Sequence, residues 1–234
     1  LAHGALTYIS EAAAGTPVVL GVQRRDDMAY YNSAVLLGPD AEVVQTYDKH
    51  HLVPFGEYIP FGDLLGRIGL RGMAAQFGSG FSSGPGADLM DLGPLGQALP
   101  LICYEAVFAR DVNAAPARPA FLMQLTNDAW FGKGQGPLQH LAQARMRAIE
   151  QGLPMARVAN TGVSAMIDPW GRITKSLALN EAGFLDAPLP APRPATPYSR
   201  WGEWPFFFIT LAGFALVILR RRRNLKFDQR GRQS

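Results

Sequence analysis

An uncharged stretch at residues 204–219 constrains this chain more than any other feature of its sequence. A helix that crosses the hydrocarbon core of a bilayer needs about twenty apolar residues, with a lower limit near seventeen. Counted from Trp201, the stretch reaches nineteen residues and includes Glu203 near one end, where this side chain can reach the headgroups. Tryptophans stand at its start and four arginines follow it, as expected for an interfacial aromatic belt and a cytoplasmic anchor. We therefore predict a transmembrane helix over residues 201–219; the alternative is a helix buried in a protein core.

The distribution of charge predicts an orientation and excludes one class of partner. Residues 220–234 contain seven arginines and lysines against Asp228 alone, a net charge of +6. Because the whole chain carries +3, the other 219 residues sum to −3, which does not suit a nucleic-acid-binding surface. If the arginines stay in the cytoplasm, the preceding domain lies across the membrane. We expect a bacterial inner-membrane protein with a periplasmic domain and a cytoplasmic tail.

Cys103 is the only cysteine in the chain. A lone cysteine can be inert packing, because free cysteine is among the most buried residue types. An oxidising periplasm, however, tends to pair spare thiols, so an unpaired one there favours a chemical role. The chain also begins without a methionine or a signal peptide. We expect it to be the carboxy-terminal part of a longer protein.

The rest of the chain alternates predicted strands and helices, which indicates a layered α/β domain. A helix is expected to end near Ala14, and a hairpin to turn at residues 38–40. Helices are predicted at 104–113 and 138–151, and strands at 17–22, 30–37, 42–47, 98–102, 121–125, 155–159, 164–167 and 173–177. The predicted organisation is a domain at 1–187, a proline-rich linker at 188–200, the transmembrane helix at 201–219 and a basic tail at 220–234.

Three segments contain residues suited to nucleophilic catalysis: 47–58, 101–105, and 127–132 with 136–140. Cys103 falls where a buried strand passes into a predicted helix, whose amino terminus would stabilise a thiolate. Lys49 could supply a nearby cation and stabilise an oxyanion, and Glu57 could hold Lys49 or transfer protons. Glu105 could order the site. The alternative for Lys49 and Glu57 is a solvated loop pair.

These segments resemble the carbon–nitrogen hydrolase (nitrilase) superfamily, and within it the apolipoprotein N-acyltransferase branch. The resemblance rests on Tyr-x-Lys-His-x-Leu-Val-Pro-Phe-Gly-Glu at 47–57, Ile-Cys-Tyr-Glu at 102–105, Asn-Asp-Ala-Trp-Phe-Gly at 127–132 and Gly-Pro-x-Gln-His at 136–140. The segments at 143–150 and 159–164 add to it. It extends over almost the whole chain, from about Pro17 onward.

The resemblance implies a fold, an activity and roles for residues. The fold is a nitrilase-like α-β-β-α sandwich, truncated at its amino end and followed by one transmembrane helix. The activity is the last step of bacterial lipoprotein maturation: an acyl chain passes from a phosphatidylethanolamine-like phospholipid to the cysteine, then to the amino terminus of a diacylglyceryl apolipoprotein. Cys103 matches the nucleophile, Lys49 the triad lysine and Glu57 a second glutamate, with Tyr104 and Glu105 in support. No cofactor is implied, and we expect a monomer.

Two features depart from or extend this pattern. The general-base glutamate of the family stands in an upstream Trp-Pro-Glu segment that is missing here, so we expect no turnover by these 234 residues alone. The glycine-rich segment 55–81 is interpreted as arms that touch the bilayer and admit acyl chains, the alternative being an ordinary packed loop. Its apolar residues are Phe55, Ile59, Phe61, Leu64, Leu65, Ile68, Leu70, Met73, Phe77 and Phe81.

Other readings remain open. His50, His51 and His140 lack a second ligand cluster at zinc spacing, so no metal site is assigned. A membrane-anchored amidase could hydrolyse small amides with the same residues. A non-catalytic remnant could serve as a membrane-anchored binding or scaffold domain.

Overall fold

The structure is a computed structural model that describes residues 2–60 and 80–231. Its contacts divide the chain into two units, Leu1–Pro194 and Ala195–Ser234. Seven of the ten apolar residues listed for segment 55–81 lie outside the described residues: Phe61, Leu64, Leu65, Ile68, Leu70, Met73 and Phe77. The interpretation of segment 55–81 as membrane-touching arms therefore stays a prediction.

The first sheet is built from the opening part of the chain. Helix α1 (Ala2–Ala12) precedes three antiparallel strands in the order β1-β2-β3. These are β1 (Val18–Asp26), β2 (Ala29–Leu37) and β3 (Val43–Asp48). The predicted hairpin at 38–40 is confirmed as the β2–β3 connection. The strand predicted at 17–22 is longer than expected and pairs with β2 as far as Asp26.

The second sheet has six strands in the order β4-β5-β6-β7-β8-β9. Its members are β4 (Met90–Asp91), β5 (Gln97–Ile102), β6 (Phe121–Asn127), β7 (Met155–Asn160), β8 (Ser164–Ile167) and β9 (Ile173–Leu177). Strands β5, β6 and β7 are parallel to one another, and the remaining pairs are antiparallel. Because parallel strands end at the same edge of a sheet, the residues that follow β5, β6 and β7 are brought together.

One predicted helix is wrong as a single element. Residues 104–113 form a 3-10 turn, η3 (Cys103–Val107), and a short helix, α3 (Ala109–Asn113). Phe108 separates them with an extended backbone, φ −107° and ψ 123°. Its ring stacks on that of His51, with centroids 4.6 Å apart, and meets Tyr104 edge-on. These aromatic contacts accompany the break in the helix.

The second predicted helix is confirmed as α4 (Gly136–Gln151), which begins two residues earlier than expected. Pro137 stands in its first turn, and Gly152 ends it with a left-handed backbone at φ 63°. Two shorter 3-10 turns, η2 (Gly93–Leu95) and η4 (Asp128–Phe131), complete the described elements of this unit.

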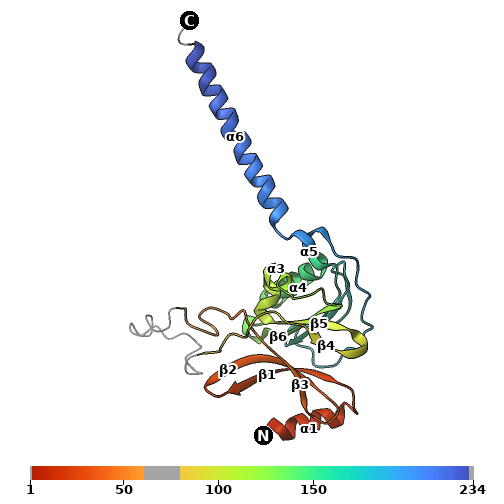
Figure 1. The fold of residues 1–234 in the computed structure, drawn as a ribbon. Coiled ribbons are helices and arrows are strands. Elements are labelled where there is room, and N and C mark those ends of the chain that lie inside the picture. Colours follow the sequence, from red (N-terminus) through yellow and green to blue (C-terminus); the bar gives the residue numbers. More distant parts are fainter. Residues whose placement is uncertain (1, 61–79, 232–234) are drawn as a thin grey trace. The chain divides into compact units, whose positions relative to one another are not determined.

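The two sheets and their helices form α-β-β-α layers, as expected (Figure 1). Along β5, β6 and β7 of the six-stranded sheet, side chains alternate between two cores. On β5, Ala98 and Ile102 pack toward the first sheet, whereas Leu99 and Leu101 pack with the cluster that contains the α4 residues Leu141, Ala144 and Ala148. Thus β5 is buried on both faces, and its carboxyl end emerges between two packed layers.

The second unit contains α5 (Pro197–Trp201) and α6 (Trp204–Gly231). The long helix begins at Trp204 rather than at Trp201, because Gly202 interrupts the chain at φ 53° and ψ −134°. It continues through the arginines, so the predicted basic tail is helical as far as Gly231. By length and composition, Trp204–Arg221 could cross a membrane.

Candidate active site

Cys103 stands directly at the end of β5 and begins the η3 turn. Its backbone is left-handed, with φ +49°. A residue with a side chain reaches this conformation at a cost of about 1–2 kcal/mol, so the surrounding contacts must hold it. The half-buried Cys103 thus stands on a sharp turn from β5 into η3. The sequence had predicted its position at the end of a buried strand.

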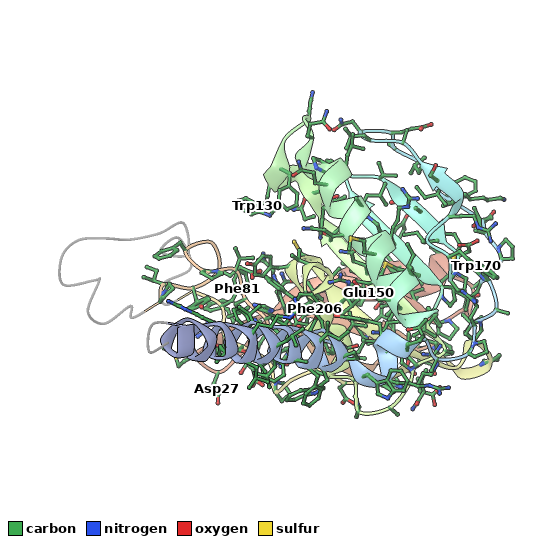
Figure 2. All side chains as sticks on the ribbon, turned by 90° about the horizontal axis from the view of Figure 1, so that it is seen from above. Asp27, Phe81, Trp130, Glu150, Trp170 and Phe206 are labelled. Carbon is green, nitrogen blue, oxygen red and sulfur yellow. The ribbon has the colours of Figure 1, made fainter. Side chains whose placement is uncertain are left out.

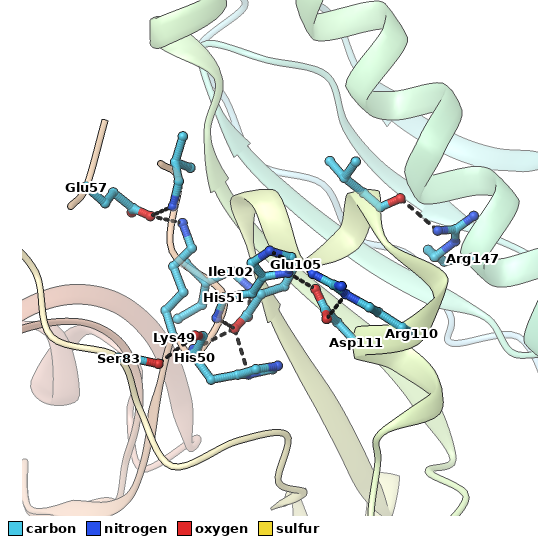
Figure 3. Close-up of polar contacts among 12 residues, drawn as sticks. Lys49, His50, His51, Glu57, Ser83, Ile102, Glu105, Arg110, Asp111 and Arg147 are labelled. Carbon is cyan, nitrogen blue, oxygen red and sulfur yellow. Dashed lines mark hydrogen bonds and ion pairs between the residues drawn. The ribbon is translucent and has the colours of Figure 1, made fainter. Parts of the chain in front are cut away.

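Lys49 follows the last residue of β3, and its amide still donates to the carbonyl of Asn32 on β2 at 2.9 Å. Its side chain is fully buried, and Nζ donates to Oε2 of Glu57 at 2.6 Å (Figure 3). An ammonium group is buried only when it is paired and hydrogen-bonded, because its desolvation is costly. The solvated alternative for this lysine is thus wrong.

A tight turn at residues 53–58 presents Glu57 to Lys49. The amides of Gly56 and Glu57 donate to the carbonyl of Val53, and Phe55 donates to the carbonyl of Tyr58. The carboxylate of Glu57 closes the turn by accepting from the amide of Val53 at 2.8 Å. The carboxylate of Glu57 is therefore held by a backbone amide of the same turn as well as by the ammonium group of Lys49.

The chain returns at residues 81–84 to fix the main chain around Lys49. Gly84 donates to the carbonyl of Lys49 at 2.9 Å, and the hydroxyl of Ser83 donates to the carbonyl of His50 at 2.6 Å. A Cβ atom at Gly84 would lie 2.2 Å from the carbonyl oxygen of Asp48. Glycine is needed here because the two backbones approach so closely.

Glu105 connects the Lys49 segment to the Cys103 turn. Its fully buried carboxylate accepts from the amides of His50, at 2.8 Å, and Ile102, at 2.7 Å (Figure 3). It also accepts from the hydroxyl of Tyr47 at 3.0 Å. Burial and the negative charge of Glu105 raise the pKa of Tyr47 far above its ordinary range. These bonds show how Glu105 could order the site, because one carboxylate joins the Lys49 segment to the Cys103 turn.

Tyr104 takes part in a separate ring cluster rather than in this hydrogen-bond set. It meets His51 edge-on, with centroids 5.1 Å apart, next to Phe108. The imidazole of His51 lies 2.5 Å from the carboxylate of Asp111, and Arg110 contacts its other nitrogen at 3.3 Å. These contacts fix the ring of His51, which belongs to the loop after Lys49, against α3 and Phe108.

Four buried polar residues behind the Cys103 turn were not recognised from the sequence as a group. Gln124, Asp128, His140 and Arg157 are all fully buried or nearly so. Asp128 lies in the motif at 127–132 and His140 in the motif at 136–140, but the sequence assigned neither of them a catalytic role. Gln124 and Arg157 were not singled out as site residues. The available signal was a glutamine and an arginine inside segments otherwise expected to be buried strands.

The structure thus joins Lys49 to Glu57, and Glu105 to both the lysine segment and the cysteine turn. Within residues 2–60 and 80–231, the thiol of Cys103 makes no hydrogen bond. The same ranges contain no group of three or more His, Cys, Asp or Glu side chains that could hold a metal ion. The arrangement offers a thiol nucleophile, a buried cation and a carboxylate partner, which are the parts of covalent acyl chemistry.

Exposed aromatic residues lie elsewhere on the same unit. Trp130 on η4 and Trp170 before β9 are 70% and 51% exposed, and they lie well apart (Figure 2). The ring of Trp170 packs against the guanidinium groups of Arg172 and Arg193, each 4.8 Å from its centroid. Arg193 belongs to the proline-rich segment, so this contact attaches the beginning of the predicted linker to the domain.

Bacterial relatives share this sequence closely. The apolipoprotein N-acyltransferase of Rhodopseudomonas palustris is 48% identical over 192 residues, which cover 82% of this chain and 36% of that protein. Those of Bradyrhizobium diazoefficiens and Brucella melitensis are 45% and 39% identical, over 91% and 94% of this chain and 40% and 43% of the relatives. The chain therefore spans about two fifths of the length of these relatives.

Solved structures show the same fold at lower identity. A mutant of the amidase from Nesterenkonia sp. AN1 matches with a TM-score of 0.54 and 20% identity, over 78% of this chain and 66% of that one. A carbon–nitrogen hydrolase from Helicobacter pylori G27 matches with a TM-score of 0.55 and 16% identity, over 76% and 64%. The model of the carbon–nitrogen hydrolase family matches residues 10–193, the whole span that carries both sheets and the residues around Cys103. On these grounds the chain belongs to the carbon–nitrogen hydrolase family.

Proposed function

We propose that this chain carries the acyl-transfer centre of a lipoprotein N-acyltransferase, with Cys103 as its nucleophile. The observation that carries the proposal is the buried Lys49–Glu57 pair, together with Glu105, which bonds the amide of His50 beside Lys49 to the amide of Ile102 beside Cys103. The relatives that are 39–48% identical over most of this chain are named as enzymes of this kind.

The proposed reaction has two halves. The sulfur of Cys103 attacks the carbonyl carbon of a phospholipid acyl ester, the ester C–O bond breaks, and the lysophospholipid leaves with the proton of the thiol. The α-amine of a diacylglyceryl-cysteine then attacks the thioester carbon, an amide bond forms, the C–S bond breaks, and the sulfur takes up the proton lost by the amine. Lys49 stabilises the oxyanion of each tetrahedral intermediate, and Glu57 keeps the lysine in position. Tyr104 and Glu105 support the turn.

A membrane setting supports this reaction, because both proposed substrates are lipids. In helix α6, the segment Trp204–Arg221 is long and apolar enough to cross a bilayer, and it ends in the first two of four consecutive arginines. We propose an inner-membrane location, a periplasmic catalytic domain and a cytoplasmic carboxyl terminus. The acyl donor is proposed to be phosphatidylethanolamine-like. The enzyme is proposed to act as a monomer.

The experiment compares two substrate classes in a chimera in which this chain replaces the matching segment of the Rhodopseudomonas palustris relative. The chimera is incubated with phosphatidylethanolamine vesicles and a diacylglyceryl-cysteine peptide, or with small amides. We expect transfer of the acyl chain to the peptide amine, and loss of transfer in Cys103→Ser. Release of ammonia from small amides without peptide acylation would support an amidase instead. Inactivity of the chimera beside an active parent would support a non-catalytic domain.

A further inference from the structure

A charged cluster is buried behind the Cys103 turn and takes no part in the chemistry proposed above. Gln124 and Asp128 come from β6 and η4, His140 from α4 and Arg157 from β7. The side chains of these four residues are at most 2% exposed. Buried polar groups cost free energy unless each is paired, so their arrangement requires an explanation.

Arg157 fixes the orientation of its two acceptors. One guanidinium nitrogen donates to Asp128 Oδ2 at 2.6 Å, another donates to the side-chain oxygen of Gln124, and Nε donates to the carbonyl of Val163 at 3.2 Å. Because an arginine only donates, the amide oxygen of Gln124 must face it. The amide nitrogen of Gln124 is therefore directed away from Arg157.

That nitrogen and the imidazole of His140 both meet the carbonyl oxygen of Cys103. Nε2 of His140 lies 3.0 Å from this oxygen, and Nε2 of Gln124 lies 3.4 Å from it and 3.1 Å from Nε2 of His140. On the opposite side of the ring, Nδ1 of His140 lies 2.9 Å from Asp128 Oδ1. Because the carboxylate and the carbonyl only accept, Nδ1 donates to Asp128, and Nε2 donates to the Cys103 carbonyl when the ring carries a proton on both nitrogens. The four side chains thus form a connected set that ends on the backbone of the nucleophile.

The charges within the set agree with this arrangement. Burial alone would raise the pKa of Asp128, but the hydrogen bond with His140 and the charge of Arg157 outweigh it and hold the pKa below its usual range. Burial lowers the pKa of Arg157, while the negative charges of Asp128 and of the Cys103 thiolate oppose that change.

We propose that Gln124, Asp128, His140 and Arg157 are positioning residues, which hold the Cys103 carbonyl and thereby keep the nucleophile in its left-handed turn. Glu105 secures the preceding amide of Ile102, and the cluster secures the carbonyl that follows, so the strained residue is held from both sides. The consequence for catalysis rests on the proposed acyl-transfer function. The structural part does not, because it concerns a hydrogen bond to a backbone oxygen.

The single cysteine makes this hydrogen bond directly measurable. Cysteine labelled with carbon-13 at its carbonyl labels one position in the 234-residue chain. In His140→Phe and in Gln124→Leu, we expect the labelled carbonyl to shift upfield in the NMR spectrum, as a carbonyl does when it loses a donor. Asp128→Asn, which acts through His140, should give a smaller shift in the same direction. Gln139→Ala, at an exposed position next to His140 on α4, is the matched control and should leave the signal in place.

The kinetic readout uses the same variants in the chimera described above. We expect the rate constant for acylation of Cys103 to fall about 10–100-fold, with the KM for phospholipid unchanged, because a misplaced nucleophile slows the chemical step and not binding. An unshifted carbonyl in both His140→Phe and Gln124→Leu would overturn the proposal, as would a shifted carbonyl with an unchanged acylation rate. If the parent chimera forms no thioester, the proposed function fails, while the carbonyl shift still decides whether the cluster holds the turn.

Discussion

Nζ of Lys49 lies 2.6 Å from Oε2 of Glu57, and the lysine side chain is 0% exposed while that of the glutamate is 15% exposed. The pair joins the end of β3 to the turn at residues 53–58, so a buried cation has its counter-ion supplied from a neighbouring loop. A charge in this setting depends strongly on its partner, which makes the pair a structural element as well as a proposed part of the site.

The stability costs of removing the two members of the pair should not be additive. Glu57→Gln leaves the buried ammonium group without a counter-ion, and we expect the free energy of unfolding to fall by about 2–4 kcal/mol. Lys49→Met with Glu57→Gln should cost less than the sum of the single changes. Denaturant unfolding of the four proteins measures the coupling, with exposed Glu11→Gln as the control. Strict additivity would show that the ion pair does not stabilise the fold.

Glu105→Gln tests the connection between the Lys49 segment and the Cys103 turn. The carboxylate accepts from Tyr47, His50 and Ile102, and a glutamine amide nitrogen would face donors where an oxygen now accepts. We expect a loss of about 2–4 kcal/mol in stability and, in the chimera, a loss of acylation. Hydrogen exchange should show faster exchange at the amides of His50 and Ile102. Unchanged protection of both amides would contradict the role given to Glu105.

The stability of the fold should depend on pH through His50. The hydrogen bond with Glu105 raises the pKa of His50, burial opposes it, and the charge of Glu105 adds to the rise. Because the folded pKa exceeds the unfolded value of 6.5, this contribution is fully present below that pH and is lost as the pH rises through the folded pKa. His50→Gln should therefore cost about 0.5–1 kcal/mol at about pH 6 and less at about pH 9. A cost that grows with pH would contradict the assignment.

Gly162→Ala should disturb the buried cluster without removing any of its polar groups. A Cβ atom at this position would lie 2.2 Å from Oδ2 of Asp128, which Arg157 and His140 hold in place. We expect a loss of about 1–3 kcal/mol from overpacking, measured by thermal or denaturant unfolding. Gly134→Ala is the matched control, because no atom lies within 4 Å of its added Cβ. Equal stability of the two variants would show that Asp128 can move freely.

Much of the fold follows from local patterns. The hairpin at 38–40, the strands β5 to β9 of the six-stranded sheet and α4 were predictable because their hydrophobic periodicity and their glycine and proline residues agree with the tertiary structure. The short strand β4 was not predicted. The helix predicted at 104–113 was not, since Phe108 packs against His51 from a distant loop. The long helix begins at Trp204, because Gly202 ends the preceding turn.

In the candidate site, too, local contacts were predictable from the sequence and contacts between distant segments were not. Cys103, Lys49 and Glu57 were recognisable as residue types in motifs. Lys49 and Glu57 are eight positions apart, and the tight turn at 53–58 brings them into contact. The bond from Glu105 to His50 spans 55 positions, and the cluster that meets the Cys103 carbonyl comes from β6, α4 and β7. Such pairings depend on the order of parallel strands, which sequence spacing alone does not specify.

Acylation of Cys103 should change the mass of the protein. The chimera is incubated with a phosphatidylethanolamine of defined acyl chain, quenched in acid and digested, and the mass of the peptide that contains Cys103 is measured. We expect an added mass of one acyl chain on that peptide, removable by hydroxylamine, and its absence in Cys103→Ser. An unmodified Cys103 peptide while the chimera still acylates its lipopeptide would contradict the proposed nucleophile, because acyl transfer would then proceed without this thiol.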